Sequence, residues 1–381
     1  MTEHDLLVAG AGPVGLALAL ALKDSGLDVA LADTRQPEAV AADPRVLALS
    51  HGTRLTLERL GVWQALPATP IITIHVSQQG GFGRTLIRAA DYGVPALGHV
   101  LPAGALAGAL RRAVDAAGIP VLDETEVRSL APDADGVTVQ LAGRHAGERR
   151  VRLAICAEGG IRAEAAELTE RDYGQHALIA LVEAEGAPPG TAFERFTPAG
   201  PVALLPCGTS YALVHGVSPQ QADELLALDD AAYLAHLQAH LGGRLCLTSI
   251  GERLRYPLGL KVRKTPVGPR TVWLGNAAQT LHPVAGQGFN LALRDVWALA
   301  DTLLRHPGDP GATATLAAYA SRRNPDRFGT IGFTDTLVRL FSNDLAPLRH
   351  LRGAGLFALD LVGPLRHFVA KRMMFGARAW P

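Results

Sequence analysis

The six residues Gly10-Ala11-Gly12-Pro13-Val14-Gly15 constrain the fold more than any other part of the sequence. They follow a short apolar run, Asp5 to Ala9, of the kind that forms a buried parallel strand. They open an Ala- and Leu-rich stretch typical of a helix, with proline in the first turn, where no amide donor is needed. Asp28 to Ala32 has the pattern of a second strand. The sequence therefore begins with a predicted β-α-β unit.

The spacing of the glycines suits a dinucleotide. Gly10 permits a tight turn, Gly12 lets the backbone approach a pyrophosphate, and Gly15 allows close helix–strand packing. The phosphates would meet the amide donors at the helix N-terminus, which Pro13 begins. Asp33 ends the second strand about 20 residues later and can accept hydrogen bonds from ribose hydroxyls. The alternative is a glycine-rich turn that binds nothing, and this motif alone does not separate FAD from NAD.

Composition narrows the class of protein. A chain of 381 residues is too long for one compact core, so two or three domains are expected. The formal net charge is zero and no basic run stands out, which argues against nucleic acid as a partner. The three cysteines lie far apart without a C-x-x-C pair, as in a reducing compartment. They argue against a disulfide framework or a thiolate metal site, and no metal site is predicted.

The apolar stretch from Leu6 to Leu22 has about the length of a signal core or a short membrane span. However, the flanking Met-Thr-Glu-His-Asp is acidic rather than basic, and glycines interrupt the stretch at a meaningful spacing. We interpret it as a buried strand that runs into a buried helix, and we expect a cytoplasmic protein.

A second motif lies near residue 280. Trp273 to Ala278 ends a predicted strand, and Thr280 to Asn290 leads into a long helix from Gly288. Several small residues here would let the main chain press against a flat ligand. The N-terminus of the helix points back into the loop, where it would stabilise the negative charge of a reduced flavin around N1 and O2. This second motif therefore favours FAD.

The order of elements indicates an α/β fold. Residues 173 to about 257 alternate like an antiparallel sheet with two helical interruptions, and the chain is helical from Thr313 onward. We predict an FAD-binding Rossmann-like domain that is split in sequence, an inserted antiparallel β-sheet substrate domain and a helical C-terminal segment. The predicted FAD-binding parts are residues 1–70, 98–171 and 266–320, the substrate-domain parts are 71–97 and 172–265, and the C-terminal segment is 321–381.

The stretch G-N-A-A-Q-T-L-H-P-V-A-G-Q-G-F-N-L-A-L-R-D-V, residues 275–296, resembles the second FAD motif of aromatic-ring flavoprotein monooxygenases with the p-hydroxybenzoate hydroxylase fold. More narrowly, it resembles the ubiquinone-biosynthesis hydroxylases and is most similar to the 2-polyprenyl-6-methoxyphenol hydroxylases. R-V-L-A-L-S at 45–50 and L-V-R-L-F-S-N-D at 337–344 also match, so the resemblance covers nearly the whole chain.

This resemblance implies roles for individual residues. The first glycine motif and Asp33 would hold the ADP half of FAD, Arg45 would lie near the pyrophosphate or flavin, and Val127 would line the adenine side. Asn276 takes the place of the usual Asp at the ribityl chain, and Pro283 through Asn290 would wrap the isoalloxazine edge. The expected cofactor-binding residues are Gly10, Gly12, Pro13, Gly15, Asp33, Arg45, Val127, Asn276, Pro283, Gly286, Gln287, Gly288, Phe289 and Asn290.

The chain also departs from the family pattern. Besides Asn276, Gln279 replaces a common His, and Leu101 to Ala105 offers no polar side chain where relatives often have one. The middle motif, usually A-D-G-x-x-S-x-x-R, spans Ala157 to Ala165 here and keeps only its Ala and its Gly, with Glu158 in place of Asp. In the family this motif bears on both FAD and nicotinamide contacts. NAD(P)H is the family's usual electron donor, although no separate nicotinamide site is visible.

The resemblance implies a reaction. An FAD-dependent monooxygenase would use dioxygen, through a flavin C4a-hydroperoxide, to hydroxylate 2-polyprenyl-6-methoxyphenol to the 1,4-benzoquinol in ubiquinone synthesis, beside other proteins of that pathway. A related hydroxylase acting on another ring position or substrate is one alternative. A halogenase or prenyl reductase is another, although the halogenase motif W-x-W-x-I-P is absent. A non-catalytic subunit of a lipid-biosynthesis assembly is the third.

His282 and the pair Arg294–Asp295 need separate interpretation. His282 could act as an acid or base, or it could fix the turn before Pro283, and we assign it no catalytic role. Arg294 and Asp295 on the long helix are expected to support structure, through a salt bridge that holds the loop.

The tail from Leu345 to Phe375 has apolar residues at helical spacing among basic ones. It could lie on anionic lipid at the inner face of a membrane, as a peripheral contact, or pack on its own domain. The basic residues are Arg349, Arg352, Arg366, Lys371 and Arg372.

Overall fold

A computed structural model describes residues 4–80, 83–161, 167–243, 245–341 and 346–376. The predicted opening unit is present as β1 (His4–Ala9), α1 (Pro13–Leu22) and β2 (Val29–Ala32), with β1 and β2 parallel. These strands are buried on both faces, which explains their continuous apolar sequences.

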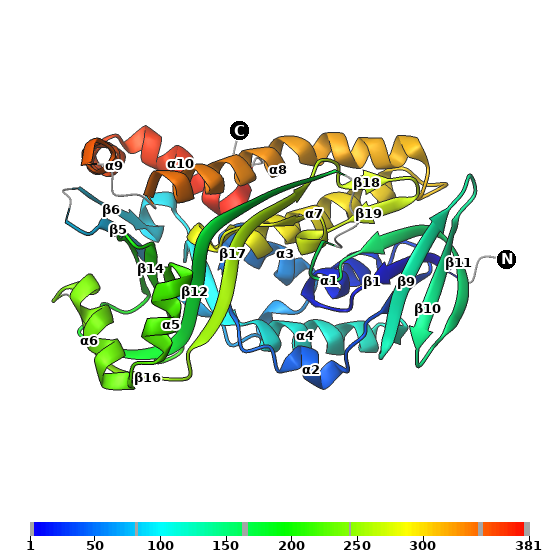
Figure 1. Ribbon diagram of the computed structural model, residues 1–381. Coiled ribbons are helices and arrows are strands. Elements are labelled where there is room, and N and C mark those ends of the chain that lie inside the picture. Colours follow the sequence, from blue (N-terminus) through cyan, green and yellow to red (C-terminus); the bar gives the residue numbers. More distant parts are fainter. Residues whose placement is uncertain (1–3, 81–82, 162–166, 244, 342–345, 377–381) are drawn as a thin grey trace.

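The opening unit lies in an eight-stranded sheet with the order β18-β19-β11-β1-β2-β8 and a β9-β10 hairpin beside β11. Helices α4 and α7 each pack against α1 on one face, while β9 and β10 cover the other (Figure 1). Side chains of β1 alternate between these two layers, as strand geometry requires. The bounds are β8 (Val121–Leu122), β9 (Thr125–Pro132), β10 (Val137–Gly143), β11 (Gly147–Cys156), β18 (Val267–Gly268), β19 (Thr271–Trp273), α4 (Ala103–Ala116) and α7 (Gln287–Arg305).

The second half of the molecule is a nine-stranded sheet with the order β20-β17-β12-β15-β14-β13-β5-β6, and β16 pairs with β12. Its pairs within the described residues are antiparallel, except that β5 and β13 are parallel. Helices α5 (Pro219–Leu226) and α6 (Asp230–Leu241) pack on one face. The strands are β5 (Thr73–Gln78), β6 (Arg84–Arg88), β12 (Leu168–Glu185), β13 (Thr191–Phe196), β14 (Pro201–Cys207), β15 (Ser210–Val217), β16 (Cys246–Ile250), β17 (Leu254–Arg263) and β20 (Gln279–Thr280).

A small sheet with the order β3-β7-β4 joins the two halves. Its strands are β3 (Val46–Ser50), β4 (Thr69–Ile71) and β7 (Gly98–Pro102), and the short helices α2 (Pro37–Ala41) and α3 (His51–Arg59) flank β3 in sequence. Strands β3 and β7 were not predicted from the sequence. Each is only five residues long and pairs with a segment that is distant in sequence, so local periodicity is a weak signal for them.

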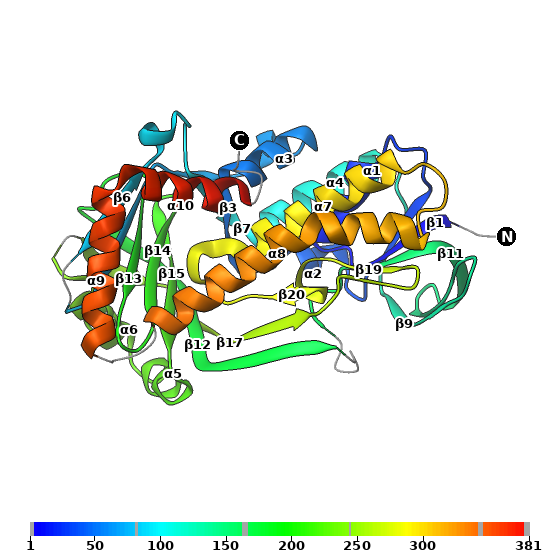
Figure 2. The same cartoon turned by 90° about the horizontal axis from the view of Figure 1, so that it is seen from above.

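Three helices end the described chain: α8 (Thr313–Phe341), α9 (Ala346–Leu361) and α10 (Gly363–Phe375). Helix α8 runs lengthwise over both halves, and α9 and α10 turn back over the far end of the large sheet (Figures 1 and 2). No helix among the described residues is long and apolar enough to cross a membrane. The architecture agrees with the predicted fold class, while the exact domain boundaries stay a prediction.

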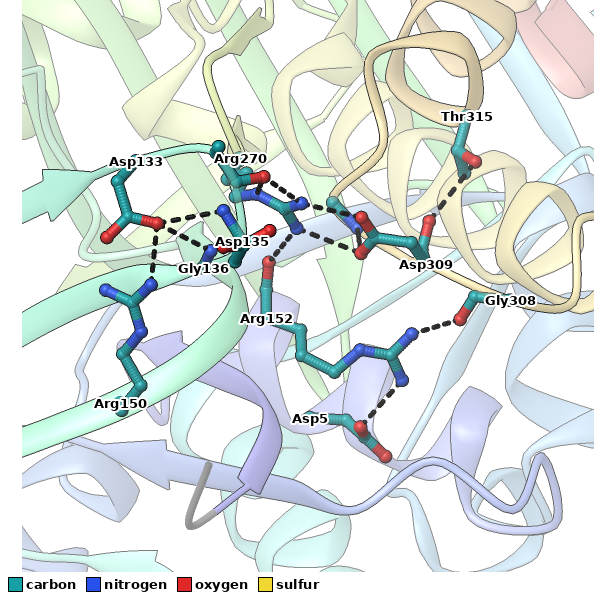
Figure 3. A network of polar contacts seen from close by, with 12 residues as sticks. Asp5, Asp133, Asp135, Gly136, Arg150, Arg152, Arg270, Gly308, Asp309 and Thr315 are labelled. Carbon is teal, nitrogen blue, oxygen red and sulfur yellow. Dashed lines mark hydrogen bonds and ion pairs between the residues drawn. The ribbon is translucent and has the colours of Figure 1, made fainter. Parts of the chain in front are cut away.

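A network of arginine contacts holds the outer end of the eight-stranded sheet (Figure 3). Arg270 pairs with Asp309 through both terminal nitrogens, at 2.9 and 2.7 Å, and its Nε donates to the Ala134 carbonyl. Arg152 donates to Asp5 at 2.9 Å and to the Gly308 carbonyl. These contacts tie the β9–β10 turn and the α7–α8 connection to the strands that position the glycine motif.

The ion pairs predicted around Arg294 and Asp295 run between helices. Asp295 pairs with Arg323 of α8 at 2.7 Å, and Arg294 pairs with Asp326 of α8 at 2.8 Å. The two neighbours do not pair with each other, because consecutive helical residues point in different directions. Gln279 donates to Asp295 at 2.7 Å, so this buried network also fixes the short strand β20 within the second motif.

Candidate cofactor and substrate site

The glycine motif forms the turn between β1 and α1. Gly10 has φ +109°, and a β-carbon there would lie 2.5 Å from the Ala157 carbonyl oxygen. A β-carbon on Gly15 would lie 1.9 Å from the Gly10 oxygen. At Gly12 the nearest heavy atom would be 3.7 Å away, on Arg35. The fold itself therefore requires Gly10 and Gly15, while Gly12 leaves open space at the start of the helix.

The N-terminus of α1 is suited to an anion. Its cap residue Gly12 makes no side-chain hydrogen bond to the helix, and its first turn holds no acidic residue. No side chain of the first turn caps the free amide groups, so they and the helix dipole face the space above Gly12. This is the arrangement that binds a pyrophosphate, so the residues present fit the ADP half of FAD.

Asp33 lies buried at the end of β2, as predicted. Its carboxylate accepts hydrogen bonds from the Ala11 amide at 2.8 Å and from the Arg35 amide and side chain at 2.9–3.0 Å. Burial acts to raise the pKa of Asp33, but hydrogen bonds from Arg35 and Ala11 outweigh it and lower this pKa. The carboxyl group is therefore ionised and held beside the glycine turn, where it can accept from a ribose.

Arg45 lies just before β3, with about half of its side chain exposed (54%). It pairs with Asp43 in a two-point contact, at 2.9 Å from Nε to Oδ1 and 2.6 Å from Nη2 to Oδ2. The Asp43 hydrogen bond raises the pKa of Arg45. Asp43 also acts on the pKa of Arg35, so the four charges of Asp33, Arg35, Asp43 and Arg45 lie in one region beside the first motif.

The second motif packs directly on the first. Gly275 has φ +56°, and a β-carbon there would lie 3.2 Å from Val14 of α1 and 3.3 Å from Ala292 of α7. Gly286 has φ +60° and precedes α7, while a β-carbon on Gly288 would meet nothing within 4 Å. The two predicted cofactor motifs, some 265 residues apart in sequence, thus lie against each other near the starts of α1 and α7.

Asn290 is the polar link between the second motif and β3. Its Oδ1 accepts from the Ser50 amide at 2.8 Å and from the Thr53 hydroxyl at 2.7 Å. Its Nδ2 donates to the carbonyls of Ala48 and Gly286 at 2.9 and 2.6 Å. All of these partners belong to the protein, so Asn290 positions the loop rather than offering a free group to a cofactor.

The other predicted residues lie in different surroundings. Asn276 is exposed on the short helical turn after β19, and Val127 is buried in β9. Gln287 is buried at the first position of α7, Phe289 packs against the main core, and Pro283 borders a cavity. The middle motif is described only from Ala157 to Ile161, and its remaining residues lie outside the described part of the chain, as do residues 342–345.

A cavity of about 310 Å³ begins at the second motif. The loop of His282 to Gln287 and strand β3 form one side, and strands β5, β6, β13, β14 and β15 form another. Helices α8, α9 and α10 close it with apolar side chains, among them Phe333, Leu337, Leu356, Leu359, Met373 and Met374. Such a lining suits a largely apolar ligand with few polar contacts.

Glu194 of β13 is an ionisable residue that lines this apolar cavity. Its carboxyl borders the cavity but is shielded from bulk solvent, and this burial raises its pKa to about 7. The group can therefore change protonation state near neutral pH, as general acids and bases do. Glu194 was not predicted from the sequence, because a Glu within T-A-F-E-R-F carries no local sign of which sheet face it occupies.

His282 also borders the cavity, and it is buried. Its Nδ1 accepts from the Val284 amide at 3.1 Å, and burial lowers its pKa to about 4. The ring is neutral at physiological pH and holds the turn around Pro283. This favours the loop-fixing interpretation of His282 over an acid–base role.

Comparison with known proteins bears on this site. The family model described as "FAD binding domain" matches residues 3–328. The chain belongs to this FAD-binding family. The predictions of FAD as cofactor and of an FAD-dependent aromatic monooxygenase are thereby confirmed, together with the resemblance to ubiquinone-biosynthesis hydroxylases.

Several curated relatives match nearly end to end. The chain is 35% identical to "Ubiquinone hydroxylase UbiL" of Rhodospirillum rubrum, over 97% of this chain and 89% of the relative. It is 31% identical to "3-demethoxyubiquinol 3-hydroxylase" of Escherichia coli, over 96% and 97%. It is 27% identical to "Ubiquinone biosynthesis monooxygenase COQ6, mitochondrial" of Homo sapiens, over 96% and 91%.

Solved structures confirm the fold class. A variant of HpxO from Klebsiella pneumoniae, solved in complex with FAD, aligns with a TM-score of 0.78 and 18% identity, over 99% of this chain and 100% of that one. The p-nitrophenol 4-monooxygenase PnpA of Pseudomonas putida DLL-E4 aligns with a TM-score of 0.77 and 16% identity, over 98% and 99%.

The different surroundings of Gly12 and Gly15 give a test of the first motif. We expect Gly12→Ala to leave the melting temperature of the apoprotein within about 2 °C, because the new methyl group has room. The same variant should bind FAD at least about tenfold more weakly, since the methyl group occupies the approach to the pyrophosphate. Gly15→Ala, the matched control, should instead destabilise the apoprotein. Fluorescence titration with FAD and thermal unfolding measure both, and unchanged FAD affinity in Gly12→Ala would contradict the assignment.

Proposed function

We propose that the chain hydroxylates a polyprenyl phenol in ubiquinone biosynthesis, converting 2-polyprenyl-6-methoxyphenol to 2-polyprenyl-6-methoxy-1,4-benzoquinol. The observation that carries the proposal is the apolar cavity that begins at the second FAD motif. The end-to-end similarity to ubiquinone hydroxylases supports the same pathway. Bound FAD, reduced by NAD(P)H, would supply the oxygen-transfer chemistry, and the protein would position the ring and exclude water.

The cofactor would be held by the residues that the two motifs bring together. Gly10, Gly12, Pro13, Gly15 and Asp33 would take the ADP half. Pro283, Gly286, Gln287, Gly288 and Phe289 would border the flavin, with Asn290 holding their loop. Arg45, Val127 and Asn276 complete the proposed set. The positive N-terminus of α7 supports this assignment, because it favours negative charge on a reduced flavin.

Glu194 is the group we propose to accept the phenol proton. A phenol becomes a stronger nucleophile toward an electrophilic oxygen as its O–H bond is broken or polarised. A carboxylate with a pKa of about 7, in an apolar cavity, is matched to this task near neutral pH.

The C-terminal helices supply the route for the prenyl tail. A cavity of about 310 Å³ holds an aromatic ring and only the first part of a long tail. The same helices α9 and α10 that close the cavity expose Phe357, Leu361, Leu365 and Phe368 on their outer surface, by 43–67%. Lys371 is exposed nearby. We propose that this surface rests on an anionic membrane, where the tail of the substrate resides.

Quinone profiling in a deletion strain tests the function. The strain would be complemented with the wild-type gene or with Gly12→Ala, and lipid extracts would be analysed by mass spectrometry. We expect 2-polyprenyl-6-methoxyphenol to accumulate, to be cleared by the wild-type gene and to persist with the variant. Accumulation of a different intermediate would move the ring position, and unchanged quinones would overturn the proposal.

The pH dependence of turnover tests Glu194. In the wild type, kcat/KM should rise as pH increases from 6 to 8 with a midpoint near 7, because the ionised carboxylate is the base. Glu194→Gln should lower kcat/KM at pH 8 by about 10²-fold or more and abolish this midpoint.

The pH dependence of unfolding provides an independent check on the ionisation of Glu194. The folded-state pKa of Glu194 lies above the unfolded value, so wild-type stability should fall as pH rises from about 4.5 to 7. Glu194→Gln should remove that part of the decline. A variant that keeps the wild-type pH profile of kcat/KM would contradict the role.

Vesicle binding tests the membrane surface. The double variant Phe357→Ser/Phe368→Ser should lose at least about 80% of its co-sedimentation with vesicles of phosphatidylcholine and phosphatidylglycerol, since less apolar area enters the interface. Leu304→Ser is the matched control, because Leu304 is equally exposed (52%) but lies on α7. Equal binding by both variants would contradict the proposal.

A further inference from the structure

Three histidines meet on the face of the large sheet opposite the cavity. His215 belongs to β15, and His236 and His240 lie four residues apart on α6, so the last two point from the same side of the helix. One ring nitrogen or more from each lies within 4.8 Å of the others. We propose that these three imidazoles bind one divalent transition-metal ion, zinc in the first instance, at a site separate from the flavin and substrate.

Strand alternation separates this cluster from the substrate cavity. The neighbours of His215 in β15, Val214 and Gly216, line the cavity, so His215 points to the other face. There it is buried beneath α6, while His236 and His240 lie closer to the surface. An ion at this position is within reach of solvent. The strand and the helix that supply its ligands, β15 and α6, are both packed in the surrounding hydrophobic core.

The distance between two of the ligand atoms fits a tetrahedral metal, and the ligand atoms of all three residues lie within 4.8 Å of one another. Nitrogen ligands about 2.0 Å from zinc lie roughly 3.3 Å apart at tetrahedral angles. The Nε2 atoms of His236 and His240 already lie 3.2 Å apart. Three protein imidazoles leave the fourth position for water or another small ligand.

Hydrogen bonds to the Nδ1 atoms of His240 and His215 orient these rings and leave their Nε2 atoms available as ligands. His240 Nδ1 lies 2.9 Å from Gln79 Oε1, an oxygen that only accepts, so Nδ1 carries the proton and Nε2 keeps its lone pair. His215 Nδ1 lies 3.1 Å from the Tyr233 hydroxyl. Metal-bound histidines typically have such a partner on the other ring nitrogen, which fixes the ring and its tautomer.

The protonation states also suit a metal. Burial lowers the pKa of His215 to about 3, and burial with the nearby His236 lowers that of His240. Both rings are therefore neutral at pH 7, as metal ligation requires. The charge of Arg195 acts in the same direction on His240 and also repels a bound dication, so binding depends on the nitrogen–metal bonds themselves.

The competing explanation is a metal-free histidine network. His215 would then be satisfied by Tyr233, His240 by Gln79, and the pair His236–His240 by one shared proton. That network predicts no metal affinity and no effect of metal on stability. The two explanations therefore differ in measurements that do not involve the monooxygenase reaction.

The test uses the full-length, FAD-loaded protein after dialysis against a chelator. With ZnCl₂ added and excess metal removed, we expect about one zinc per chain by mass spectrometry of the metal content, and a rise in melting temperature with zinc concentration. With CoCl₂, we expect visible absorption bands of tetrahedral cobalt. His240→Gln and His236→Gln should each reduce bound zinc at least about tenfold, whereas His306→Gln, at an exposed histidine elsewhere, should not.

The variants change exposed or half-exposed side chains, which limits their effect on folding. If one nevertheless unfolds, the wild-type cobalt spectrum decides alone. No zinc retained and no cobalt bands in the wild type would overturn the proposal. So would equal zinc binding by the wild type and both variants, since the metal would then lie elsewhere.

Discussion

The close approach of Gly275 to α1 brings together two motifs that lie some 265 residues apart in the sequence. At this contact the strand β19 reaches the start of α1, and no side chain larger than hydrogen fits easily between Val14 and Ala292. Because β19 lies parallel to β11 and β11 to β1, the carboxyl ends of these strands meet at one edge of the sheet. The glycine turn and the second motif follow that edge directly, and the contacts of Gly275 with Val14 and Ala292 place the second motif against both α1 and α7.

The two faces of the large sheet carry different sites. One face is the wall of the apolar cavity and carries Glu194. The other face packs against α6 and carries the histidine cluster around His215. Adjacent residues in β13 and β15 thus serve opposite faces, which is a direct result of strand alternation. A metal behind β15 would hold α6 against the same strand that lines the cavity.

Much of this arrangement could be predicted from the sequence, and the reason differs from element to element. The glycine motif was readable because turn geometry restricts residue type at Gly10 and Gly15. The buried strands β1 and β2 and the long helix α7 have strong patterns. By contrast, β3 depends on its pairing with β7 and on the Asn290 bridge, contacts between segments distant in sequence. Local pattern does not contain that information.

The same limit applies to the residues that the sequence did not single out. Glu194 is one polar position in an alternating strand, and only the folded sheet reveals that it faces a cavity. His236 and His240 have a metal-compatible spacing on a predicted helix, but the third histidine arrives from a strand some 20 residues earlier. The spacing of the cysteines argues only against a thiolate metal site. It carries no information about a site whose ligands are histidines.

Incorporation of oxygen from O₂ into the phenol tests the proposed hydroxylation most directly. Purified, FAD-loaded protein would receive NADH, ¹⁸O₂ and a short-chain 2-prenyl-6-methoxyphenol, and the product would be analysed by mass spectrometry. The account predicts one ¹⁸O atom in a new ring hydroxyl, formed in proportion to the NADH consumed. If NADH oxidation reduced the dioxygen only to hydrogen peroxide, with no oxygen in the phenol, or if no NADH were consumed with the phenol present, the proposed hydroxylation would be contradicted.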